Sequence, residues 1–145
     1  MSRKGFDQSV ADFGHAIGVL SRRVRAEAAA HGLSLAEASV LARLSRIGPA
    51  TTAELARAEL VRPQSMGATV ASLEQRGLLE RAPHPTDGRQ VNIALTPRGV
   101  ALRKTVGEAK RTWLAHAISR LGDAERETLF AAGALMEGLV SDDER

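Results

Sequence analysis

The sequence predicts a mainly α-helical fold with a small two-stranded β wing, arranged as a winged helix-turn-helix lobe between N- and C-terminal helices. Three observations support this class. An apolar stripe at helical spacing runs through the N-terminal part of the chain. Two short helical segments then meet at a tight turn. Two short segments with alternating apolar residues follow directly, as expected for a β hairpin.

The N-terminal helix is predicted over residues 6–31. Its apolar residues advance by alternating steps of four and three, the a/d pattern of a helix that packs along another helix. A second stripe, which includes Trp113, lies in the helices predicted over residues 99–141. Each stripe is expected to face another helix, within the chain or from a partner. The members of the first stripe are Phe6, Val10, Phe13, Ile17, Leu20 and Val24.

The helices of the lobe are predicted from their start signals. Ser34 and Glu37 have the spacing of a capping box, in which each side chain accepts a hydrogen bond from the other residue's backbone N–H. Thr51 and Glu54 repeat this spacing. The third helix is predicted to begin at Pro63, because proline fits the first helical position, where no backbone N–H is needed.

The wing is predicted from the stretch APHPTDGRQVNIALTPRG and the residues just before it. One strand is expected over residues 78–82. In the second strand, residues 91, 93 and 95 are apolar and are expected to face inward, which places Asn92 on the outer face. The Asp87-Gly88 dipeptide favours a turn and leaves Arg89 at the tip.

Composition limits the class of protein. The 145 residues suit a single domain, with the lobe at residues 33–98 between helices at 6–31 and 99–141. Cysteine is absent and the four histidines lack metal-ligand spacing, so no disulfide, metal or cofactor is expected. No membrane span or secretory signal is found, so the expected location is the cytoplasm. No catalytic motif is found, so neither enzymatic activity nor a catalytic residue is expected.

Positive charge is concentrated in the middle of the chain, although the net charge is only +3. Residues 43–104 hold ten Lys or Arg against five acidic residues, whereas residues 121–145 hold two against seven. The middle of the chain therefore suits a polyanion such as double-stranded DNA. Taken alone, this feature has an alternative interpretation as a solvated surface whose charges differ by chance.

The start of the third helix carries polar side chains that suit a DNA major groove. That groove admits one α-helix and presents base edges that encode the sequence. Gln64 can form two hydrogen bonds with adenine, and Arg62 can bond guanine or phosphate. Backbone N–H groups at helix starts also bind phosphate, which adds the start of the preceding helix. The candidate DNA-contacting residues of these helices are Arg62, Gln64, Ser65, Thr69, Thr51 and Thr52.

Arg89 is the wing's candidate for DNA contact. A hairpin beside a groove-bound helix lies over the next minor groove, whose negative potential attracts arginine. Asp87 is acidic and therefore unexpected at a DNA surface. We assign Asp87 to support of the wing tip, by pairing with an arginine or by capping the turn. An ordinary solvated turn charge is the alternative for Arg89, and a helix face that is polar only for solubility is the alternative for the helix residues.

The wing also resembles that of the MarR family of regulators. The residues that match the family's wing signature, D-x-R and then L-T-x-x-G, are Asp87, Arg89, Leu95, Thr96 and Gly99. Residues 62–81 resemble the family's recognition helix and first wing strand. Many relatives have a second basic residue where this chain has Gly88, so the resemblance supports one tip arginine rather than two.

The resemblance implies a homodimer that represses transcription. The terminal helices of both subunits would interlock as dimerisation helices, and each subunit would place one recognition helix and one wing on a palindromic operator. Half-sites would lie about one helical turn, roughly 10 base pairs, apart. The resemblance also implies release by small molecules bound between the dimerisation helices and the lobe. Phe13, Ile17 and Trp113 are the candidate pocket for a small aromatic effector, with core or dimer packing as the alternative.

The alternative function is a winged-helix module that binds a protein partner and has no sequence-specific DNA binding. Such a module needs neither a polar helix start nor an arginine-bearing wing in a basic region. The two functions differ in salt dependence. DNA affinity falls with salt with a log–log slope of about −0.9 per phosphate contacted, whereas a protein-binding module would bind random duplex weakly or without this dependence.

Overall fold

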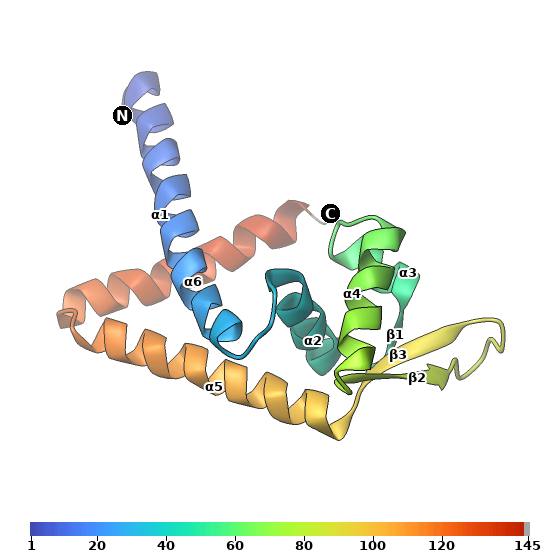
Figure 1. Ribbon diagram of the computed structural model, residues 1–145. Coiled ribbons are helices and arrows are strands. Elements are labelled where there is room, and N and C mark those ends of the chain that lie inside the picture. The colour runs from blue at the N-terminus through green and yellow to red at the C-terminus, as the bar shows by residue number, and fades with distance from the viewer. Residues whose placement is uncertain (144–145) are drawn as a thin grey trace. The chain divides into compact units, whose positions relative to one another are not determined.

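A computed structural model describes the backbone of residues 1–143 and the side chains of residues 1–141 (Figure 1). The chain divides into two compact units, Met1–Lys110 and Arg111–Arg145, and the boundary falls inside a helix. The elements are α1 (Arg3–Ala30), α2 (Leu35–Ile47), β1 (Ala50–Thr51), α3 (Thr52–Ala58), α4 (Pro63–Gln75), β2 (Leu79–Pro83), β3 (Val91–Leu95), α5 (Pro97–Ser119) and α6 (Asp123–Asp143).

The predicted fold class is confirmed, and the helix starts follow their local signals. The Ser34 hydroxyl accepts from the Glu37 N–H at 3.1 Å, and the Glu37 carboxylate accepts from the Ser34 N–H at 3.0 Å, which completes the capping box. The Thr51 hydroxyl accepts from the Glu54 N–H at 3.1 Å. Pro63 is the first residue of α4. Each start is therefore fixed within a few residues of sequence.

The small sheet has three strands in the order β1-β3-β2, all antiparallel. The two-residue strand β1 was not predicted, and it makes β3 the central strand. Asn92 therefore has strands on both sides and is only 9% exposed, whereas Val91 lies beyond β1 and is 44% exposed. The predicted orientation of these two residues was wrong, because alternation alone does not reveal a third strand.

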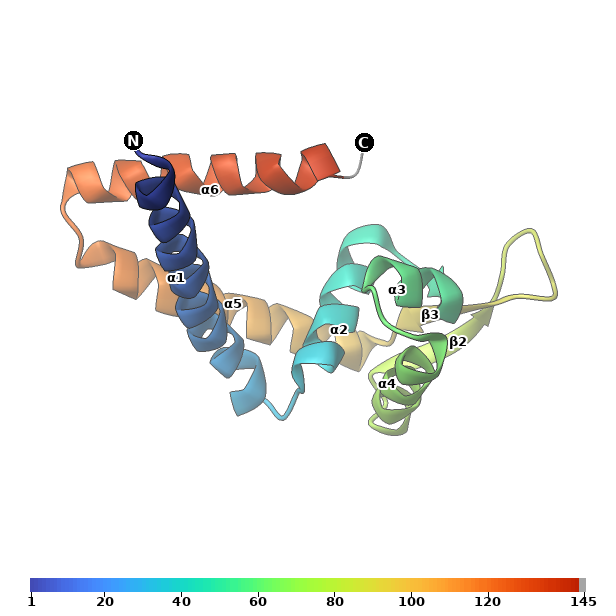
Figure 2. The same ribbon diagram turned by 90° about the horizontal axis from the view of Figure 1, so that it is seen from above.

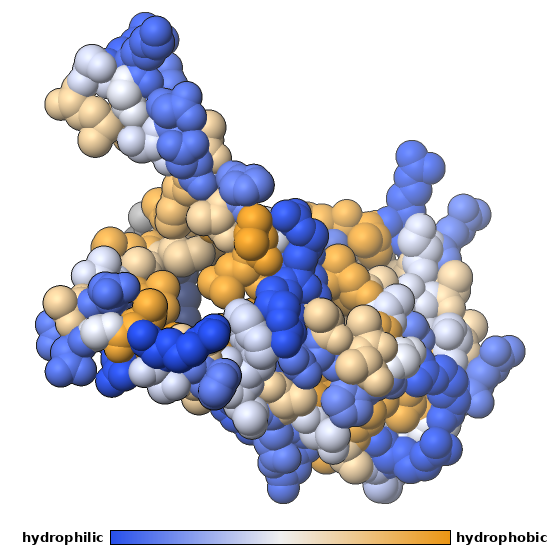
Figure 3. Space-filling view, turned by 60° about the vertical axis from the view of Figure 1, so that its left-hand side comes forward, coloured by the Kyte–Doolittle hydropathy of each residue, from blue (hydrophilic) through white to orange (hydrophobic). Residues whose placement is uncertain are grey.

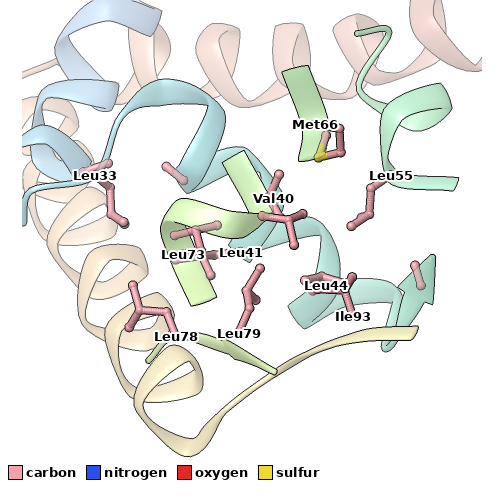
Figure 4. Close-up of a cluster of buried hydrophobic side chains, with 14 of the residues drawn as sticks. Leu33, Val40, Leu41, Leu44, Leu55, Met66, Leu73, Leu78, Leu79 and Ile93 are labelled. Carbon is pink, nitrogen blue, oxygen red and sulfur yellow. The ribbon is translucent and has the colours of Figure 1, made fainter. Parts of the chain in front are cut away.

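A hydrophobic core joins α2, α3, α4 and the sheet (Figure 4). From α4 the core receives Met66, Val70 and Leu73, which are spaced four and three residues apart and are at most 2% exposed. Each fully buried side chain of this size contributes about 1.5–3 kcal/mol relative to exposure. This packing fixes the rotation of α4 about its own axis, and it therefore decides which α4 side chains face solvent.

The wing is attached to α5 by a close backbone contact. The Thr96 hydroxyl donates to the Gly77 carbonyl at 2.6 Å and accepts from the Gly99 N–H at 3.1 Å. A Cβ atom at Gly99 would lie 2.1 Å from the Leu78 carbonyl oxygen, so only glycine permits this approach. The L-T-x-x-G part of the signature therefore has a structural cause at the base of the wing.

The terminal helices expose apolar side chains. Only Ala28 of α1 is buried, while Phe6, Phe13 and Ile17 are 59%, 46% and 38% exposed. No described side chain of α6 is buried, and Phe130 is 62% exposed. Figure 3 colours such apolar surface orange. Among the described residues, no helix combines the length and apolar character needed to cross a membrane.

Candidate nucleic-acid interface

The outward face of α4 is set by its inward face. Because Met66, Val70 and Leu73 point into the core, Gln64 lies on the opposite side of the helix and is exposed. Arg62 is the N-cap residue of α4 and is also exposed. The sequence interpretation missed the remaining members of this strip, although helical spacing from the core residues would have found them. These are Ala68, Ala71 and Gln75, all exposed.

Ser65 and Thr69 lie on the flank of α4 that faces α2. Both line a cavity of about 340 Å³ together with Ser39 of α2. Ser65 is exposed, whereas Thr69 is half-buried and donates its hydroxyl to the Ser65 carbonyl at 3.1 Å. The structure therefore does not bring these two residues onto one strip with Gln64.

Thr51 and Thr52 are placed differently from each other at the start of α3. Thr51 is only 8% exposed, and its hydroxyl is occupied as the cap of the helix. Thr52 is half-buried and is the first residue of α3. Since the Thr51 side chain is enclosed, its position suits a structural cap rather than a side-chain contact with a ligand.

The wing tip, residues 84–90, is held by its own polar groups. The Asp87 carboxylate accepts from the Arg89 N–H at 3.0 Å and from the Gln90 side-chain amide at 3.4 Å. The Asp87 carbonyl accepts from the Gln90 N–H at 3.1 Å. These bonds close the turn and leave Arg89 exposed at the end of the hairpin, which extends beyond α3 and α4 (Figure 2).

His84 also organises the tip, a role that the sequence did not indicate. Its Nδ1 atom accepts from the Asp87 N–H at 3.1 Å and from the Thr86 N–H at 3.3 Å. An imidazole nitrogen that accepts hydrogen bonds carries no proton, so this arrangement places the ring proton on Nε2. Two backbone N–H groups of the tip thus depend on one histidine nitrogen.

The arginines of the lobe fall into two groups. Arg76 bonds the Gly32 carbonyl at 2.9 Å and Glu37 at 3.3 Å, and Arg81 pairs with Glu74 at 2.9 Å. Among the side chains of residues 1–141, neither Arg62 nor Arg89 forms an ion pair with a carboxylate. Their positive charge is therefore available to an anionic partner, whereas that of Arg76 and Arg81 is partly compensated.

Comparison with known proteins places the chain in a family. Residues 31–90 match the sequence model of the MarR family. An HTH-type transcriptional regulator of Mycobacterium tuberculosis (strain CDC 1551 / Oshkosh) is 39% identical over 131 residues, which cover 90% of this chain and 92% of the relative. This chain belongs to the MarR family. An HTH-type transcriptional repressor of Mycobacterium tuberculosis (strain H37Rv) is 36% identical over 103 residues, covering 71% of this chain and 74% of the relative.

Solved structures share the fold of this chain. A protein from Mycobacterium tuberculosis has a TM-score of 0.76 at 27% identity, covering 95% of this chain and 94% of its own. A MarR family protein from Bacillus stearothermophilus has a TM-score of 0.82 at 19% identity, covering 100% and 99%. A Staphylococcus aureus MepR variant bound to an oligodeoxyribonucleotide has a TM-score of 0.67 at 18% identity, covering 91% and 97%. The last two likenesses show the fold.

A cavity of about 620 Å³ in this MarR-family protein is lined by cations from two helices. Arg22 and Arg25 of α1 and Lys110 of α5 line it, with alanine and leucine side chains as its apolar wall. Burial lowers the pKa of Lys110, and the nearby charges of Arg103 and Arg25 lower it further. The Arg103 Nε atom is buried and has no hydrogen-bond partner within the described residues. Among the described residues that line the cavity, none is acidic.

The predicted effector pocket differs from this cavity. Phe13 and Ile17 are partly exposed residues of α1, and Trp113 belongs to the other compact unit. None of these three residues lines the cation-rich cavity. Their grouping into one pocket stays a prediction.

Two carboxylates join helices of the MarR lobe: Glu37 of α2 accepts bonds from α4, and Glu59 at the end of α3 accepts bonds from α2. Burial acts to raise the pKa of Glu37, but hydrogen bonds from Ser34 and Ser72 and the charge of Arg76 outweigh it and hold that pKa below its usual value. The pKa of Glu59 is lowered in the same way, against burial, by Ser39 and Arg43. Both carboxylates are therefore stabilised in the ionised form that their donors require.

Proposed function

We propose that this protein is a sequence-specific DNA-binding repressor that binds a palindromic operator as a homodimer and responds to a small anionic effector. The observation that supports DNA binding most strongly is that α4 exposes Arg62 and Gln64 at its start while the wing tip exposes Arg89. Gln64 and Arg62 suit base edges of the major groove, and Arg89 suits the minor groove. A MepR variant of the same fold was solved bound to an oligodeoxyribonucleotide, which supports DNA as the class of partner.

The remaining predicted residues have subsidiary roles in this proposal. Ser65 and Thr69 on the α2-facing flank of α4, and Thr52 at the start of α3, suit contacts to phosphate rather than to base edges. Thr51 acts through the helix cap that it forms. Asp87 acts by fixing the shape of the wing tip.

The exposed apolar stripe of α1 supports the homodimer. Phe6, Phe13 and Ile17 recur at the spacing of a helix seam and remain exposed in a single chain. Apolar patches of this kind mark interaction surfaces. Two copies joined along such helices would present two α4 helices to half-sites centred about 10 base pairs apart.

The DNA proposal is tested by selecting bound duplexes from a random library and then measuring variants on the selected sequence. We expect an enriched inverted repeat. Gln64→Ala should relax the preference at one base pair by about 1–3 kcal/mol, and Arg89→Ala should weaken binding on all sequences, most strongly where flanks are rich in A·T. Gln8→Ala, the same change at an exposed site on α1, and Arg111→Ala, at an exposed site on α5, are the matched controls.

Three outcomes would contradict the DNA proposal. One is the absence of any duplex binding at low salt, which would favour the protein-interaction module. A second is binding without salt dependence, because each phosphate contact should add about −0.9 to the log–log slope. The third is an equal loss on every sequence for Gln64→Ala, which would show that Gln64 does not contact bases.

The cation-lined cavity supports an anionic effector. Arg25 and Lys110 line the cavity, and the charge of Arg103 acts on Lys110 as well, so the cluster has like charges that an anion would neutralise. The alanine and leucine wall suits an apolar body on the ligand, so an aromatic carboxylate fits both parts of the lining. Benzoate serves as the probe and is expected to lower operator affinity, whereas benzamide, its neutral amide, is expected to have little effect. Equal effects of both compounds would contradict the anionic class.

A further inference from the structure

Ser39 of α2 lies between two cavities that serve different parts of the lobe. One is the cation-lined cavity with Arg25 and Lys110. The other is the smaller cavity beside α4, lined by Ser65 and Thr69. Arg25, Leu35 and Ser39 line both. A ligand in the first cavity would therefore touch residues that also border α4.

The hydroxyl of Ser39 is part of a clamp on Glu59. It donates to one Glu59 carboxylate oxygen at 2.6 Å, and Arg43 Nε donates to the other oxygen at 2.6 Å. An Arg43 Nη2 atom also donates to the Ala58 carbonyl at 3.3 Å. Glu59 is the C-cap residue of α3. The clamp thus ties α2 to the point where the chain leaves α3 and turns towards α4.

The turn that the clamp holds is strained. Leu60 has a φ of 55°, in the left-handed region that leucine rarely adopts, and its side chain is 92% exposed, so side-chain packing does not hold it there. A strained residue persists only where its surroundings fix it. The bonds on Glu59 are next to it in sequence, and α4 starts at Pro63, three residues later. Release of Glu59 would therefore let the turn relax and the start of α4 move.

We propose that Ser39 is a positioning residue through which an anion in the cation-lined cavity loosens the turn before α4. The inference rests on the anionic effector of the proposed function. A serine hydroxyl has a single proton to donate. If the Ser39 hydroxyl donates its hydrogen bond to a bound anion, it no longer donates to Glu59. The anion also places a second negative charge near the Glu59 carboxylate. Glu59 is then held by Arg43 alone, and the base-contacting start of α4 loses its fixed position.

The experiment compares the full-length protein with Ser39→Ala and with Ser45→Ala, the same substitution at an exposed site of α2. Three quantities are measured with and without benzoate: benzoate binding by calorimetry, amide hydrogen exchange of residues 59–66, and affinity for the selected operator. In the unsubstituted protein, benzoate should speed exchange in residues 59–66 by about tenfold, the factor expected for loss of one hydrogen bond to a charged group.

Ser39→Ala should behave as if the effector were already present. Exchange in residues 59–66 should be about tenfold faster without benzoate, and benzoate should add less than about twofold, although it still binds. Ser45→Ala should match the unsubstituted protein. The inference is overturned if Ser39→Ala responds to benzoate as the unsubstituted protein does, or if benzoate leaves residues 59–66 unchanged in the unsubstituted protein.

Failure of the proposed function gives a different pattern. Benzoate could speed exchange in residues 59–66 through Ser39 and yet leave operator affinity unchanged. In that case the ligand response of the proposed function fails, while the transmission step, meaning the coupling of the cavity to the turn through Ser39, stands. If benzoate lowers operator affinity equally in the unsubstituted protein and in Ser39→Ala, the ligand response stands and the transmission step fails. A merely structural Ser39 would slow or speed exchange without removing the benzoate effect.

Discussion

Leu60 is the residue at which sequence and backbone conformation conflict most clearly. Its φ of 55° brings Cβ close to the following carbonyl oxygen, which costs an L-residue roughly 1–2 kcal/mol. Its side chain is 92% exposed and gains little from burial. The turn between α3 and α4 is therefore maintained at a cost by the contacts around Glu59.

Leu60→Asn should stabilise the protein, because asparagine tolerates the left-handed region. We expect a gain of about 1 kcal/mol in the free energy of unfolding, or roughly 3 °C in Tm for a chain of this size. Thermal and denaturant unfolding would measure it. Leu60→Ala is the control, since alanine keeps the Cβ strain but removes the exposed apolar side chain. An equal gain for alanine would mean that exposure, not φ, is the cause.

At the scale of elements, the wing depends on bonds within its tip more than on burial. Asp87 and His84 together accept four of the tip's N–H bonds: the backbone N–H groups of Thr86, Asp87 and Arg89, and the Gln90 side-chain amide. A loop of this kind has few apolar contacts to define its shape, so polar closure decides where Arg89 is presented.

Asp87→Ala should weaken DNA binding although it removes a negative charge from the DNA-facing side. The loss of closure would leave Arg89 poorly placed, and we expect part of the effect of Arg89→Ala. Asp87→Asn is the informative comparison, because asparagine keeps the side-chain acceptor and removes the charge. Operator affinity would be measured for both. Tighter binding by both variants would show that repulsion from phosphate outweighs support of the tip.

At this scale, the sequence predicts the elements that depend on residues close together in the chain and misses those that depend on distant residues. The starts of α2 and α4 depend on residues only a few positions apart, and they were predicted. Strand β1 is two residues long and forms by pairing with the distant β3. No local sequence pattern indicates it, so it was not predicted. The same holds for Ser65 and Thr69, whose orientation towards α2 is set by the packing of α4 in the core.

At the scale of the whole molecule, the open question is what covers the apolar stripe of α1. A second copy of the chain is our proposal, and the DNA geometry depends on it, since one copy offers only one α4 and one wing. Ile17 lies on this stripe and is 38% exposed, while His15 lies on the opposite side of the helix.

Ile17→Glu should convert a dimer into monomers and abolish cooperative binding to the inverted repeat, because it places a charge in an apolar seam. His15→Glu introduces the same charge away from the seam and should leave the mass unchanged. Sedimentation equilibrium would give the mass of each variant. A dimer that survives Ile17→Glu would mean that other surfaces join the subunits.

Helix α5 begins at the glycine contact that anchors the wing, and Lys110 projects from it into the cation-lined cavity. The stretch of α5 between Gly99 and Lys110 spans about 16 Å at 1.5 Å per residue. We expect a ligand that displaces Lys110 to move the base of the wing as well, because one continuous helix joins the two. Gly99→Ala would place a methyl group against the Leu78 carbonyl oxygen and separate α5 from the wing. Such a variant should still bind the ligand in the cavity, but ligand binding should no longer change the position of Arg89.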